Sequence, residues 1–119
     1  MKLDEFRRQM ESYRQQADKE ATQLRDSFVV RRRLLQLYGR FDAHERLMAN
    51  QLLSEWALSE DEAIRFDALG LIKDLKISTA MPSLRQLAER LRREQSPGAP
   101  FELEKVERIM AEIMPKRPE

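Results

Sequence analysis

The sequence has no cysteine and uses glycine and proline sparingly. Without cysteine, the chain has no disulfide, no thiol nucleophile and no thiolate metal ligand. Among its 119 residues are three glycines and five prolines, and the first 80 residues contain no proline. Runs of alternating β-branched residues are also missing. These features favour an all-α chain.

Long apolar segments and an excess of charge of one sign are absent too. No segment approaches the roughly 20 apolar residues that span a bilayer, and residues 1–16 contain no apolar run of the signal-peptide type. The 22 basic and 21 acidic residues leave a net charge of +1. This balance argues against a general nucleic-acid binder and against an anionic-membrane binder. We therefore expect a cytoplasmic protein, bacterial in style, with no membrane association.

Apolar spacing predicts about six helices, which short connections arrange as antiparallel hairpins. The first should cover Leu3–Arg25, the second about Ser27–Tyr38 and the last about Phe101–Met114. The third, fourth and fifth should begin near residues 42, 59 and 78, with the fourth ending near Leu75. We expect a break between the first two helices, although Phe28 continues the apolar stripe and leaves one continuous helix open. The segment "SPGAP" (96–100) is the clear loop.

Helix starts carry recognisable capping signals. Asp42 with Glu45, and Ser59 with Glu62, have the spacing of capping boxes. The second helix could be capped by Asp26 or Ser27, and the fifth by Ser78 or Thr79 with Pro82 in its first turn.

Three helices have apolar faces that predict their packing. The first helix has one narrow stripe, which suits a peripheral helix or a dimer seam. The third has one wide face, and Leu47 and Leu58 lie opposite it, so we expect this helix to be buried on two sides. The three faces are, in order, Leu3, Phe6, Met10, Tyr13, Ala17, Ala21 and Leu24; Met48, Ala49, Leu52, Leu53, Trp56 and Ala57; and Leu84, Leu87, Ala88 and Leu91.

The segment "DEAIRFDALGLIKDL", followed by "AMPSLRQLAERL", resembles a HEAT repeat of the short, HEAT-like type. The resemblance covers residues 59–92 well and 26–58 faintly, and a weak repeat of about 34 residues accompanies it. It implies a short α-α superhelix in a single domain, 1–119. An N-terminal capping helix (1–25) and a C-terminal helix (101–114) would flank two hairpins (26–95). The matching residues are Asp61, Ile64, Arg65, Ala68, Leu69, Ile72, Ala80, Met81, Pro82 and Leu84.

The resemblance also suggests roles for individual residues. It implies an Arg–Asp contact between stacked repeats, which would make Arg65 and Asp61 structural. Phe66 points away from the main apolar face, so it either packs between repeats or serves as an exposed aromatic anchor for a partner. In this family the second helices of the hairpins line a concave face, here the third and fifth helices. The residues expected there are Arg46, Asn50, Ser54, Arg85, Glu89, Arg92 and Arg93.

Chemistry-bearing residues are sparse, and we expect no enzyme, no cofactor and no metal site. His44 is the only histidine, and a metal site needs more nitrogen or sulfur ligands than the chain contains. No glycine-rich phosphate loop occurs, and no Ser-His-Asp set has supporting spacing. The "RRR" run (31–33) fans out over roughly 200° of a helix and forms no single phosphate-tracking stripe.

The sequence therefore predicts a non-enzymatic protein–protein interaction module. A dedicated inhibitor such as a bacterial immunity or antitoxin protein is the specific form we expect, with a toxin or effector as its partner. Two alternatives stay open: a nucleic-acid-binding regulator that uses arginine-rich helix faces, and a self-assembling subunit that forms a homodimer through the N-terminal helix.

Overall fold

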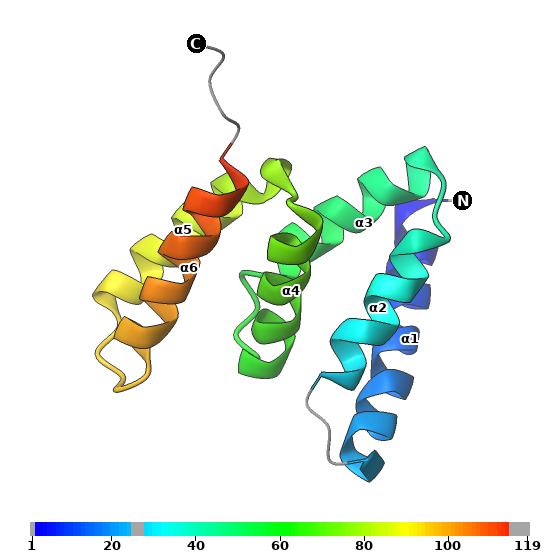
Figure 1. Ribbon diagram of the computed structural model, residues 1–119, viewed down its shortest axis with the longest axis horizontal. Coiled ribbons are helices and arrows are strands. Elements are labelled where there is room, and N and C mark those ends of the chain that lie inside the picture. Colours follow the sequence, from blue (N-terminus) through cyan, green and yellow to red (C-terminus); the bar gives the residue numbers. More distant parts are fainter. Residues whose placement is uncertain (1, 25–27, 115–119) are drawn as a thin grey trace. The chain divides into compact units, whose positions relative to one another are not determined.

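A computed structural model describes residues 2–24 and 28–114, and within these ranges the chain is helical with no β-strand. The all-α prediction is confirmed (Figure 1). The elements are α1 (Leu3–Leu24), α2 (Val29–Gly39), α3 (Ala43–Trp56), α4 (Glu62–Leu75), the single 3-10 turn η1 (Ser78–Ala80), α5 (Met81–Arg93) and α6 (Ala99–Ile113).

The chain divides into two compact units. Unit 1 comprises Met1–Leu52 and unit 2 comprises Leu53–Glu119, so the boundary falls inside α3.

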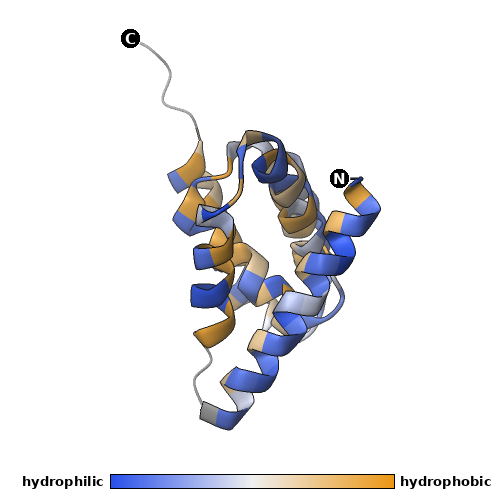
Figure 2. Ribbon diagram, turned by 90° about the vertical axis from the view of Figure 1, so that its right-hand side faces the viewer, coloured by the Kyte–Doolittle hydropathy of each residue, from blue (hydrophilic) through white to orange (hydrophobic). Residues whose placement is uncertain are grey.

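In unit 1, α1 and α2 lie side by side and run in opposite directions (Figure 1). The ribbon of α1 is mostly hydrophilic with spaced apolar positions (Figure 2). Of those positions Phe6, Met10 and Ala17 are buried, and the Phe6 ring centroid lies 5.1 Å from that of Phe41. These three positions of the stripe of α1 therefore pack within unit 1. A dimer seam on α1 stays a prediction.

The prediction that the first two helices are separate is confirmed, because α1 and α2 run in opposite directions. The expected capping residues Asp26 and Ser27 lie outside the described residues. Phe28 occupies the N-cap position of α2 and makes no side-chain capping hydrogen bond.

The start of α3 is a capping box, as predicted. The Asp42 N–H donates to the Glu45 carboxylate at 3.0 Å, and the Glu45 N–H donates to the Asp42 carboxylate at 2.8 Å. Each side chain thus satisfies a backbone donor that has no partner within the helix.

The predicted capping box of Ser59 and Glu62 is wrong. Asp61 is the N-cap of α4, and its carboxylate accepts hydrogen bonds from the N–H groups of Ala63 and Ile64. Ser59 instead accepts from the Asp61 N–H, outside the helix. An aspartate at this position accepts the same hydrogen bonds as a serine and also places a negative charge at the positive end of the helix dipole.

The predicted cap of α5 is also wrong. Ser78 and Thr79 belong to the 3-10 turn, and Ala80 stands at the N-cap without a side-chain hydrogen bond. Pro82 lies in the first turn of α5, as predicted. The last helix begins at Ala99, two residues before the expected Phe101, because a proline at position 100 fits a first helical turn.

The core of unit 2 comes from the end of α3 and from α4, α5 and α6. The predicted apolar faces of the third and fifth helices are buried as expected, including Trp56. The last helix packs against both α4 and α5, and its Val106, Ile109 and Ile113 are buried. A helix outside the HEAT-like resemblance is therefore a central part of this core.

One expectation for the third helix is wrong. Leu47 is 66% exposed, and Leu58, which follows the end of α3, is half-buried, so α3 itself is not buried on the side opposite its main face. A single exposed leucine is common on protein surfaces and requires no packing partner.

The N-cap of α4 gives a test of local stability. Replacing Asp61 by alanine should lower the free energy of unfolding by about 1 kcal/mol, because two backbone donors lose their acceptor. Asp61→Asn should have little effect, and Ser59→Ala should cost less than Asp61→Ala. Urea unfolding followed by circular dichroism measures all three, and a larger loss for Ser59→Ala would contradict the assignment of Asp61.

Candidate functional site

A buried ion pair in unit 2 joins α4 to α6. Arg65 is only 6% exposed and forms a bidentate ion pair with Glu102. The Arg65 Nε donates to one Glu102 oxygen at 2.6 Å, and Nη2 donates to the other at 2.9 Å. Paired, parallel hydrogen bonds of this kind add directional specificity to the charge attraction.

The third nitrogen of Arg65 reaches the loop between α3 and α4. Its Nη1 donates to the carbonyl oxygens of Ser59 at 3.0 Å and Glu60 at 3.4 Å. Arg90, from α5, donates to the carbonyls of Leu58 at 3.0 Å and Ser59 at 3.4 Å. Two arginines from different helices therefore satisfy the backbone acceptors of this loop, which keeps its path fixed beside α4.

The hydrogen bonds that Arg65 donates to Glu102 raise the pKa of Arg65 above its ordinary value, and burial opposes that effect. Because both the ordinary and the raised pKa lie far above neutrality, Arg65 stays charged under physiological conditions. The resemblance implied that Arg65 and Asp61 are structural, through an Arg–Asp contact between stacked repeats. In the structure Arg65 pairs with Glu102 of α6 and Asp61 caps α4, so each residue has a structural contact of its own.

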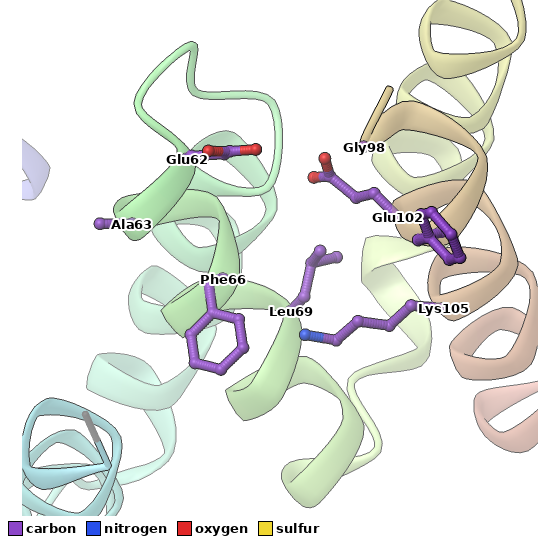
Figure 3. Close-up of a pocket in the computed structure, with 8 residues that line it drawn as sticks. Glu62, Ala63, Phe66, Leu69, Gly98, Glu102 and Lys105 are labelled. Carbon is purple, nitrogen blue, oxygen red and sulfur yellow. The ribbon is translucent and has the colours of Figure 1, made fainter. Parts of the chain in front are cut away.

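Next to this ion pair, α4 and α6 border an open groove of about 540 Å³ (Figure 3). Arg65 and Glu102 hold the two helices together, and Glu102 also contributes to the groove wall. The lining residues are Glu62, Ala63, Phe66, Leu69, Gly98, Phe101, Glu102 and Lys105.

The groove combines apolar surface with charges of both signs. Leu69 is buried at its base, whereas Phe66 is 38% exposed and Phe101 is 76% exposed. Lys105 reaches across from α6, and its Nζ lies 4.1 Å from the centroid of the Phe66 ring (Figure 3). This contact is a cation–π interaction, which holds the lysine side chain over the aromatic face.

Of the predicted partner-binding residues, only Phe66 lines this groove. Arg46 and Asn50 belong to unit 1, where the Tyr38 hydroxyl donates to Asn50 at 2.9 Å and the Arg46 guanidinium lies 5.4 Å from the Tyr38 ring centroid. Their role in partner binding stays a prediction.

On α5, the exposed predicted residues form a charged network. Glu89 accepts from Arg92 at 3.5 Å and from Arg93 at 3.1 Å, and Arg92 also reaches Glu107 of α6 at 3.4 Å. Arg85 is exposed on the same helix. The shared concave face predicted for the third and fifth helices stays a prediction.

The arginine run 31–33 lies on α2 in unit 1. Arg33 forms a bidentate pair with Glu20 of α1, at 2.6 and 3.2 Å, and its hydrogen bond lowers the pKa of Glu20. The charge of Arg33 is therefore compensated by a carboxylate of its own chain.

Sequence reasoning missed Phe101 and Lys105 as groove residues. Phe101 lies off the buried stripe of α6, which Val106 and Ile109 mark. The sequence signal for Phe101 is an aromatic residue that lies off an otherwise complete apolar stripe. Phe66 has the same signal on α4.

Within residues 2–24 and 28–114, no three potential metal-ligating side chains come together, and His44 is exposed on the first turn of α3. In the same ranges, no helix combines the length and the apolar character required to cross a bilayer. Comparisons with protein-family models, curated proteins and solved structures find no match to this chain.

The ion pair gives a test with an internal control. Glu102→Gln should lower the free energy of unfolding by about 2 to 3 kcal/mol, because it leaves a buried guanidinium without its counter-charge. Glu104 lies two residues away on α6 and pairs with Arg108 at the surface, so Glu104→Gln should cost less than about 0.5 kcal/mol. Urea unfolding followed by Trp56 fluorescence measures both, and equal losses would contradict the structural role of the pair.

Proposed function

We propose that this chain is a non-enzymatic protein–protein interaction module and that its contact surface is the groove between α4 and α6. The observation that carries the proposal is the exposure of Phe66 and Phe101 on either side of a groove with buried Leu69 at its base. Aromatic side chains in apolar pockets dominate the binding energy of many protein interfaces.

The ion pair supports this proposal through preorganisation. Because Arg65 and Glu102 hold α4 and α6 together, the groove walls need little ordering when a partner binds. A surface that is ordered before binding loses less conformational entropy on association, which improves affinity. Glu62 and Lys105 at the groove edge add charges that can orient an incoming chain.

Within this proposal we favour a dedicated inhibitor, such as a bacterial immunity or antitoxin protein that acts in the cytoplasm on a toxin or effector. The short HEAT-like arrangement of residues 59–92 belongs to the same proposal. The charged network of α5 supports it, because its exposed arginines and acids, such as Arg93 and Glu89, offer charge-assisted contacts to a folded partner.

Affinity capture tests the contact surface. The immobilised chain should retain a specific protein from an extract of the organism that encodes it, and quantitative mass spectrometry identifies that protein. Calorimetry with the purified partner should then show roughly tenfold or greater weakening for the double variant Phe66→Ala, Phe101→Ala.

Leu47→Ala is the matched control, since it removes an exposed leucine outside the groove. The pair Arg85→Glu and Arg92→Glu tests the α5 surface in the same assay. Unchanged binding of the groove variant, together with loss of binding in the α5 variant, would move the interface to α5 and contradict the proposal.

A further inference from the structure

Phe101 is an exposed aromatic side chain beside a groove that is large enough to hold a phenyl ring. It stands in the first turn of α6 and is 76% exposed. The neighbouring groove has about 540 Å³, whereas an apolar protein cavity of about 150 Å³ is sufficient to bind benzene. The groove therefore has room for a phenyl ring in addition to the side chains that line it.

Acidic and basic side chains lie at different positions along the groove. The two bordering helices run the same way, with Glu62 and Gly98 at one end and Lys105 further along with Leu69 (Figure 3). The Glu62 side chain is 85% exposed, and its carboxylate lies 4.0 Å from the Arg65 guanidinium of the same helix. The groove thus has an acidic end and a basic position, with exposed aromatic surface alongside.

Such a surface is complementary to itself. In a two-fold symmetric dimer the same patch occurs on both sides, so that residue i meets residue j and residue j meets residue i. If two grooves face each other in antiparallel orientation, Lys105 of each copy meets Glu62 of the other. Phe101 of each copy then enters the groove of the other.

We propose that a second copy of this chain occupies the groove and forms a two-fold dimer through Phe66, Phe101, Glu62 and Lys105. This inference rests on the proposed function, in which the groove is a contact surface. It adds that self-association covers the groove until another protein displaces the second copy. On docking, Lys105 leaves the Phe66 ring for the carboxylate of the opposing Glu62, and the ring is freed to pack against the opposing Phe101.

Sedimentation velocity on the full chain, from micromolar to hundreds of micromolar protein, tests this proposal. The wild-type chain should show a reversible monomer–dimer equilibrium, and Phe101→Asp should be monomeric throughout. Leu47→Asp, the matched control outside the groove, should dimerise like the wild type. Circular dichroism checks that each variant is folded.

A charge exchange tests the orientation. Lys105→Glu and Glu62→Lys should each weaken the dimer roughly tenfold or more, because each places two like charges opposite one another. The double variant should restore the dissociation constant to within a few-fold of the wild-type value. Failure of that rescue would overturn the antiparallel arrangement.

Two results would overturn the second-copy proposal as a whole. One is a wild-type chain that stays monomeric at every concentration, and the other is a dimer that survives Phe101→Asp. A monomeric wild type whose captured partner is still lost in the variant Phe66→Ala, Phe101→Ala would leave the proposed function intact. If neither the dimer nor the captured partner responds to substitution of Phe66 and Phe101, both proposals are rejected.

Discussion

The buried ion pair between Arg65 and Glu102 is the interaction on which unit 2 depends. A guanidinium that is removed from water is costly unless acceptors surround it, and here a carboxylate of α6 and two loop carbonyls surround it. Apolar packing alone tolerates sliding of one helix along another, whereas two parallel hydrogen bonds have a defined geometry. The pair therefore ties the position of α6 to that of α4, and the groove between the two helices follows from it.

That geometry separates the structural and exposed residues of α4. Arg65 faces inward because its hydrogen-bond partners are there, while Phe66, one position later and about 100° around the helix, faces the groove. The placement of α6 thus accounts for both residues, because it gives Arg65 a buried partner and leaves Phe66 exposed at the groove. The groove is bordered by two helices whose relative position the ion pair of Arg65 and Glu102 defines.

Much of the fold could be predicted because its determinants are local. The capping box of Asp42 and Glu45 and the buried face of α5 follow from spacings of three or four residues. The errors arose where several candidates competed or where distant residues decided. Asp61, and not Ser59, caps α4 because it is the residue directly before the helix. Glu102 lies 37 residues from Arg65 in the sequence, and helical periodicity does not predict contacts at that separation. The groove was missed for the same reason, since half of its lining comes from α6 and the residue that precedes it.

The distribution of aromatic residues has a practical consequence for optical spectroscopy. The single tryptophan, Trp56, is buried in unit 2, and the two tyrosines of the chain, Tyr13 and Tyr38, both belong to unit 1. Each unit thus contains its own intrinsic chromophore. Excitation at the long-wavelength edge of indole absorption, where phenol does not absorb, follows unit 2 alone, and the phenol emission at shorter wavelength than that of indole reports on unit 1. Coincident unfolding transitions would indicate that the two units unfold as one cooperative structure. Separate transitions would indicate that unit 1 and unit 2 unfold independently.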